Sequence, residues 1–170
     1  KISADELDIV AKTITINDKE KKIFGEGEVV VTTKDGLIIN TDKIIYDKLN
    51  NILEAKNNVN IVDKINNSKI IADKIIYYKN EEIIQTFGKT DILFKDNYKI
   101  QTSDIIFDRT KQTFLSKKDT ITTDKFNNKL SVNNFIYSIQ NYTLRSQGKV
   151  KLIDNLNNSY FFKDILADTK

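Results

Sequence analysis

The feature that most constrains the fold of this chain is a motif that recurs about every 30 residues. Its clearest copy is IADKIIY at residues 71–77. The places equivalent to the aspartate of this copy are spaced 37, 31, 30, 30 and 30 residues apart, and these anchor positions are Asp5, Asp42, Asp73, Ser103, Asn133 and Lys163. Self-similarity at a fixed period of about 20 to 50 residues is the signature of a fold built from stacked repeats.

Apolar residues keep fixed places around each anchor. Two and four positions after it the side chains are mostly aliphatic or aromatic, and this shared parity puts them on one face of an extended strand. The residue three positions before the anchor, such as Ile70, is also mostly apolar but has the opposite parity. Because one extra residue in a strand reverses the face of all later side chains, we predict a kink or bulge close to each anchor.

A second strand follows the anchor in each repeat. Apolar, small and β-branched residues alternate along it, which is typical of a strand. Near the middle stands Gly27, Asn57, Gly88, Lys118 or Gly148, and glycine inside a strand marks a bulge or bend. Pairs of residues that mostly suit turns separate the strands, at 35–36, 50–51, 66–67, 80–81, 96–97, 110–111, 127–128, 140–141 and 157–158. A longer turn is expected at 17–22.

These patterns predict an all-β protein: an elongated antiparallel β-roll, or jelly roll, of two facing sheets and about eleven strands. Two-stranded units bury a continuous core only when they stack on their neighbours. We therefore interpret residues 1–170 as a single repeat-built domain, with repeats starting near residues 2, 39, 70, 100, 130 and 160.

Several kinds of chemistry lack their usual residues. The chain has no His and no Cys, which removes histidine bases, thiol nucleophiles and disulfides. The 27 basic and 24 acidic residues are interleaved, so no basic stripe marks a nucleic-acid partner. No run of 18 apolar residues predicts a membrane-spanning helix. We expect no enzyme activity, no cofactor and no metal, and we expect the anchor aspartates to bond backbone N–H groups at bends.

The paired motifs resemble the OstA-like lipopolysaccharide-transport family, which includes LptA, the periplasmic part of LptC and the N-terminal domain of LptD. The motifs are Ile-x-Ala-Asp-Lys-Ile-x-Tyr and apolar-x-Ala/Ser-x-Gly-x-Val-x-Ile. They recur along essentially the whole chain, most clearly at 2–7, 23–31, 39–61, 70–92 and 144–152. Copies four to six lose the Ala-Asp pair, and Lys118 replaces a glycine. Six repeat starts without a terminal cap favour the N-terminal domain of LptD, with an LptA-like bridge protein as the other candidate.

The resemblance implies a periplasmic domain, at the periplasmic face of the outer membrane, that shields the acyl chains of lipopolysaccharide in an apolar interior. Its implied partners are neighbouring transport-bridge proteins, joined through edge strands, and an outer-membrane barrel in the same chain or in a partner. The expected lipid-binding residues are Leu7, Ile44, Tyr46, Leu53, Ile75, Tyr77, Ile84, Ile105, Phe107, Phe114, Phe135, Tyr137 and Leu144. For any one of these residues, packing against its neighbours is the ordinary alternative.

Two other classes of protein remain open. One is a structural parallel β-helix of a surface adhesin, although turns every 15 residues or so favour longer strands. The other is a carbohydrate-binding or depolymerising β-solenoid, which would show carboxylates and aromatic residues clustered on an outer face. The end strands, 2–9 and 159–168, are predicted to be open sheet edges. A proline at Leu7 is then expected to weaken partner binding without unfolding the domain.

Overall fold

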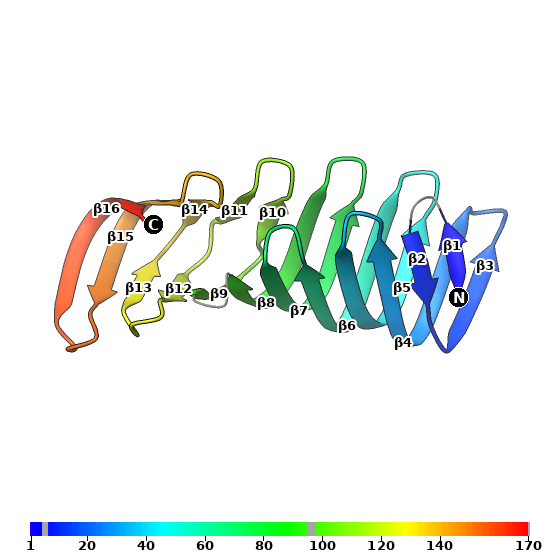
Figure 1. Cartoon of the computed structure of the whole chain (residues 1–170), viewed down its shortest axis with the longest axis horizontal. Coiled ribbons are helices and arrows are strands. Elements are labelled where there is room, and N and C mark those ends of the chain that lie inside the picture. Colours follow the sequence, from blue (N-terminus) through cyan, green and yellow to red (C-terminus); the bar gives the residue numbers. More distant parts are fainter. Residues whose placement is uncertain (5–6, 95–97, 170) are drawn as a thin grey trace.

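The computed structural model describes residues 1–4, 7–94 and 98–169, which form one elongated sheet that winds around a long axis (Figure 1). Every strand pairing in this part of the chain is antiparallel. The parallel β-helix alternative is therefore wrong for the described residues. The anchor Asp5 and the predicted turn at 96–97 lie outside them. No helix long and apolar enough to cross a membrane occurs in the described ranges.

The strands fall into a group of long strands and a group of mostly shorter ones. From the N-terminus they are β1 Ile2–Ala4, β2 Leu7–Val10, β3 Thr13–Asn17, β4 Lys22–Thr33, β5 Leu37–Asp47, β6 Ile52–Asp63, β7 Ser68–Tyr78 and β8 Ile83–Phe94. They continue as β9 Tyr98–Ser103, β10 Ile106–Asp108, β11 Thr113–Ser116, β12 Thr120–Thr123, β13 Lys129–Val132, β14 Phe135–Ser138, β15 Thr143–Ile153 and β16 Ser159–Asp168.

The predicted all-β class and antiparallel pairing are confirmed, but the predicted number of about eleven strands is wrong, because the sheet contains sixteen. Two features explain the difference. The segment before residue 18 forms three short strands instead of one or two. Between residues 98 and 138, each predicted long strand is divided at its bend into two separate strands.

Bends near the middle of the long strands produce the predicted change of face. In β5, Ile39 and Thr41 are buried before the bend, whereas Ile44 and Tyr46 are buried after it, and the register with β6 shifts between residues 40 and 43. The facing strands bend at residues with positive φ, namely Gly27 (75°), Asn57 (65°), Gly88 (77°) and Gly148 (105°). Glycine adopts this left-handed conformation without a steric penalty, and asparagine tolerates it.

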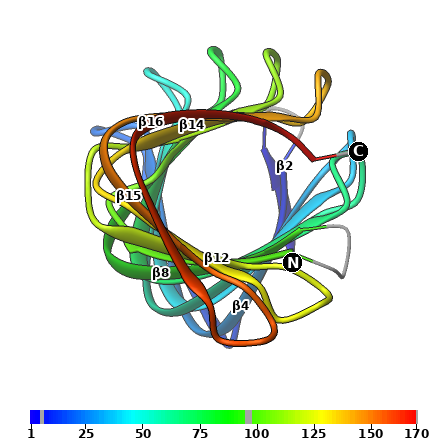
Figure 2. The same cartoon turned by 90° about the vertical axis from the view of Figure 1, so that its left-hand side faces the viewer.

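The bends fold the sheet into two walls that enclose an interior, as the view down the long axis shows (Figure 2). One row of turns, the upper turns, comprises residues 48–51, 79–82, 109–112 and 139–142 and runs along the top of Figure 1. The other row, the opposite turns, includes residues 34–36, 64–67, 124–128 and 154–158. We call the wall next to each row the upper wall and the opposite wall. The gap between the two rows of turns is the mouth of the interior.

Apolar side chains from both walls meet in one continuous core. Aromatic rings contribute much of it: Phe107 stacks on Phe114 at a centroid distance of 4.3 Å, and Phe94 meets Tyr137 edge to face at 5.5 Å. At the bends, buried hydroxyl groups satisfy backbone groups. The Thr41 hydroxyl donates to the carbonyl of Lys56 (2.7 Å), for example. Buried polar groups need such partners, so these residues let the sheet fold over at low cost.

The ends of the sheet differ from the sequence-based expectation at the N-terminus. Strand β2 pairs antiparallel with β1 on one side and with β4 on the other. Leu7 therefore lies in an internal strand, and the expectation that a proline there would spare the fold is wrong. The outermost N-terminal strands are β1 and β3, while β16 pairs with β15 at the other end.

Candidate functional site

The thirteen residues predicted to line the interior all point into it and are all buried. Twelve of them belong to the upper wall, because they lie between the bends and the upper turns. Leu7 alone lies on the opposite wall, where β2 pairs with Thr33 and its neighbours in β4. The predicted set thus describes one face of the interior, and whether it binds lipid stays a prediction.

The sequence-based prediction missed most of the opposite wall. Its buried side chains lie between the bends and the opposite turns, and they include Ile39, Ile61, Ile70, Ile92 and Ile100. A signal for them was present, since Ile39, Ile70 and Ile100 each stand three positions before an anchor with the opposite parity. Each bend reverses the face of the strand. Residues of opposite parity before and after the bend therefore both point into the interior, where the two sets of apolar side chains face each other.

The N-terminal section of the interior, from β2 to β8, is filled by its own side chains. Tyr46, Leu53 and Ile61 are completely buried, and Ile44 packs so closely over Gly25 that a Cβ atom at that glycine would lie 2.9 Å from it. Tyr46 and Tyr77 turn their hydroxyl groups toward the upper turns, where they donate to the side chains of Asn51 and Glu82 (both 2.8 Å). This section is therefore packed with its own side chains.

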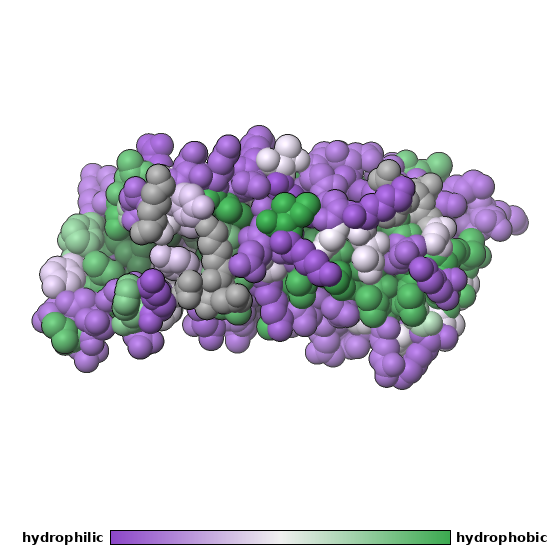
Figure 3. Space-filling model, in the orientation of Figure 1, coloured by the Kyte–Doolittle hydropathy of each residue, from purple (hydrophilic) through white to green (hydrophobic). Residues whose placement is uncertain are grey.

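The C-terminal section holds a cavity of about 130 Å³ between the walls. Its lining combines apolar side chains of the upper wall, including Tyr137 and Leu144, with those of the opposite wall, including Phe94, Ile100 and Leu130. Polar side chains also line it: Thr122, Asp124, Asn128 and Thr169. In the space-filling view, hydrophobic side chains show in a recess toward the C-terminal end (Figure 3). Of the predicted residues, only Tyr137 and Leu144 contribute to the cavity.

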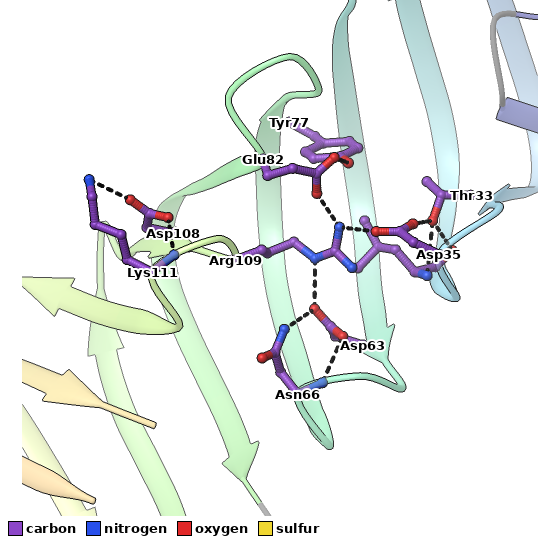
Figure 4. Close-up of polar contacts among 10 residues, drawn as sticks. Thr33, Asp35, Asp63, Asn66, Tyr77, Glu82, Asp108, Arg109 and Lys111 are labelled. Carbon is purple, nitrogen blue, oxygen red and sulfur yellow. Dashed lines mark hydrogen bonds and ion pairs between the residues drawn. The ribbon is translucent and has the colours of Figure 1, made fainter. Parts of the chain in front are cut away.

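The mouth of the N-terminal section is closed by a cluster of charged side chains around Arg109 (Figure 4). Arg109 stands in an upper turn and its side chain is only 4% exposed. Its Nε donates to Asp63 (2.7 Å) and its guanidinium also donates to Asp35 (2.7 Å), and both acceptors border the opposite turns. The guanidinium further contacts Glu82, which stands in a neighbouring upper turn.

Hydrogen bonds within each turn position these carboxylates. Asp63 accepts from the backbone N–H (3.0 Å) and the side-chain amide (2.9 Å) of Asn66, and Thr33 donates to Asp35. Burial alone raises the pKa of Asp35, but the hydrogen bonds from Thr33 and Arg109 outweigh it and hold this pKa below its ordinary value. Burial and the bond to Glu82 raise the pKa of the Tyr77 hydroxyl, which remains a neutral donor.

Aspartates next to the bends accept hydrogen bonds from neighbouring backbone and amide groups, but those that bond backbone N–H groups are not the predicted anchor residues. Asp104 and Asp164 accept hydrogen bonds from the backbone N–H groups of Gly88 and Gly148 (both 2.9 Å), and Asp42 accepts from the Asn58 amide (2.7 Å). Asp104 and Asp164 each follow an anchor by one residue, a shift that the sequence-based alignment did not resolve. In the described part of the chain, no group of three or more carboxylates is arranged to hold a metal ion.

Known proteins resemble this chain in structure but not in sequence. No family model matches the chain, and no curated protein sequence matches it. LptH from Pseudomonas aeruginosa, described as the LptA-homologous periplasmic component of the lipopolysaccharide transport device, is similar over 62% of this chain and 80% of its own, with 15% identity and a TM-score of 0.55. The TCP10 domain of Danio rerio CPAP, in complex with a STIL peptide, has a TM-score of only 0.17, with 12% identity over 94% of this chain and 100% of its own. The first comparison shows that this chain has an LptA-like fold.

Proposed function

We propose that this chain is a lipopolysaccharide transport domain that works in the periplasm without catalysis. Its interior would shield lipid acyl chains from water while they move toward the outer membrane. Two observations support the proposal. The fold is similar to that of LptH, a periplasmic component of lipopolysaccharide transport. The two walls also present apolar side chains to each other along the chain, as an acyl chain requires.

The observation that carries the proposal is the cavity in the C-terminal section. An apolar cavity of about 150 Å³ in a protein core stays dry and binds benzene. The cavity of about 130 Å³ described here therefore accepts a short piece of hydrocarbon without any rearrangement.

The N-terminal section would bind acyl chains only after its walls move apart. Tyr46, Leu53 and Tyr77 are fully buried, and a dense core does not yield space for a ligand without displacement. The predicted residues of the upper wall therefore divide into two groups. Tyr137 and Leu144 would contact lipid in the closed conformation, and the ten others in an opened one.

The open ends of the sheet suit partners that extend it. Strands β1, β3 and β16 each have one described neighbour, so their outer backbone groups can pair with the strand of another protein. On β16, Phe161 and Leu166 are 73% and 74% exposed, and such apolar side chains favour an interface. Neighbouring bridge proteins or an outer-membrane barrel would join at these ends, in the manner of an LptA-like bridge protein or the N-terminal domain of LptD.

Adjacent residues of β15 provide a test of lipid binding. Leu144 faces the interior and is buried, whereas Arg145 faces solvent. A photo-crosslinking amino acid at position 144 should capture lipopolysaccharide, and the same amino acid at position 145 should capture little. The product is measured by immunoblotting after irradiation in the presence of lipopolysaccharide. Equal capture at both positions, or none at position 144 in a folded protein, would contradict the proposal.

A further inference from the structure

The mouth of the interior is tied by two kinds of contact that differ in charge. In the N-terminal section, Arg109 reaches from an upper turn to Asp35 and Asp63 beside the opposite turns. Nearer the C-terminus, the Tyr98 hydroxyl donates to the carbonyl of Thr169 across the mouth (3.2 Å). The first tie joins ionic groups and the second joins neutral ones, and hydrogen bonds between ionic groups are roughly twice as strong.

The three carboxylates around Arg109 do not have the same place in the fold. Glu82 belongs to the same row of turns as Arg109, so its ion pair holds two upper turns together. Asp35 and Asp63 belong to the other side, so their ion pairs hold the two walls together. Each of these two carboxylates is also positioned by its own turn, through Thr33 and Asn66. Arg109 is therefore the side chain that links the two rows in this cluster.

An ionic closure differs from an apolar one in what happens when it opens. Asp35 lies at the rim of the molecule, where its side chain is already 41% exposed, whereas Asp63 is buried. If the rows of turns separate, water can solvate the guanidinium and the carboxylates and recover the free energy that their burial cost. Separation of an apolar seam would instead expose hydrocarbon to water. A closure made of ion pairs at the rim can therefore open and close reversibly.

We propose that Arg109, Asp35 and Asp63 form a latch that holds the mouth of the N-terminal section shut. Release of the latch lets the upper turns and the opposite turns move apart and gives access to the packed interior of β2 to β8. The latch itself is a property of the free protein. Its use in admitting an acyl chain rests on the proposed function.

The test measures the width of the mouth with pairs of spin labels. The chain contains no cysteine, so introduced cysteines are the sole labelling sites. Lys64→Cys with Lys111→Cys spans the mouth from an opposite turn to an upper turn, and both positions are exposed. Glu81→Cys with Lys111→Cys joins two upper turns and serves as the control pair. Distances are measured by pulsed electron paramagnetic resonance without ligand.

The decisive variant is Asp35→Asn with Asp63→Asn, which neutralises both carboxylates that cross the mouth. Its matched control is Glu82→Gln, which removes an ion pair of Arg109 within one row. We expect a longer distance component for the spanning pair in the double variant, and no change for the control pair or for Glu82→Gln. If the double variant is unfolded, the single variant Asp35→Asn replaces it, because Asp35 is half-exposed. A spanning distance that stays unchanged in the folded double variant overturns the latch, and so does an unchanged distance in Asp35→Asn where only that variant folds.

Uptake of a fluorescent fatty acid then separates the latch from the proposed function. The double variant should bind more probe than the unmodified protein, and a cross-linker joining the cysteines at positions 64 and 111 should abolish the gain. A wider mouth without a gain in probe binding supports the latch and contradicts a lipid-binding interior in this section. A gain in binding without a wider mouth contradicts the latch alone.

Discussion

The N-terminal and C-terminal sections of this molecule are built from the same repeat, yet they differ in continuity, packing and closure. Strands β4 to β8 run through their bends as units of 11 or 12 residues, whereas β9 to β14 have three to six residues each. The first section is filled, and the second holds the cavity. A repeat can thus keep its strand pairing while the packing of its interior changes along the chain.

Residues at the bends account for part of this difference. Two positions before the bend residue, the N-terminal copies carry Gly25 and Ala55, which let the walls approach closely. Later copies carry Thr86, Ser116 and Ser146, whose buried hydroxyl groups bond to other polar groups at the bends. Each replacement puts a polar atom where the earlier repeats put only hydrocarbon or none. Thr86 and Ser146 stand in the undivided strands β8 and β15, but their hydroxyl groups bond backbone groups of Ile105 and Asn134, at the breaks between β9 and β10 and between β13 and β14. Such bonds compete with the ladder hydrogen bonds of the divided strands.

The largest expected effect comes from removing the charge that ties the walls of the filled section. Arg109→Met should lower the free energy of unfolding by about 3–5 kcal/mol, because it leaves the buried Asp63 without its cation. Arg109→Lys should recover only part of the loss, since a compact ammonium group does not reproduce the planar fork with which the guanidinium bonds its carboxylates. Urea unfolding followed by circular dichroism measures both. A loss below 1 kcal/mol for Arg109→Met would show that the cluster is not a structural tie.

A second prediction compares truncation of leucines in the two sections. Leu53→Ala should cost about 2–5 kcal/mol, because Leu53 is completely buried in the filled section. Leu152→Ala should cost less, since Leu152 is only partly buried and already borders the cavity. The unfolding free energies of the two variants give the comparison directly. Equal losses would mean that the C-terminal section is as tightly packed as the N-terminal one.

A third prediction concerns acid. The folded-state pKa of Asp35 lies below its ordinary value of 3.8, so its contribution to stability is fully present above about pH 5 and is lost as the pH falls through the folded-state pKa. Asp35→Asn removes this contribution at neutral pH. The difference in stability between the unmodified protein and Asp35→Asn should therefore shrink as the pH falls below 3.8. Thermal unfolding between pH 2 and pH 7 tests this, and a constant difference over that range would refute it.

The smallest effects concern the bends themselves. Gly88 has a φ of +77°, so Gly88→Ala should cost about 1–2 kcal/mol through backbone strain. Lys118 occupies the equivalent place in the next repeat but is absent from the residues with positive φ. Lys118→Gly should therefore bring no gain and a loss of roughly 0.5–1 kcal/mol from added chain entropy. If Lys118→Gly instead stabilised the protein, the division between β11 and β12 would be explained by the missing glycine alone.

Much of this molecule could be predicted from the sequence because the relevant forces are local. Alternation of apolar residues defines the strands, Asn- and Asp-rich pairs define most turns, and Gly88 or Asn57 marks a bend through its backbone conformation. The reversal of parity between Ile70 and Ile75 indicates a change of face without any knowledge of the partner strand. The all-β class and the apolar upper wall follow from these patterns.

The tertiary structure alone decided how the two walls meet. Arg109 looks like an ordinary turn residue in the sequence, and its partners Asp63 and Asp35 are 46 and 74 residues away. Which opposite turn lies across from an upper turn depends on the twist and offset accumulated over several strands, and no local pattern encodes these quantities. The same holds for the cavity beside Leu144, because its volume is what remains after side chains from distant repeats have packed.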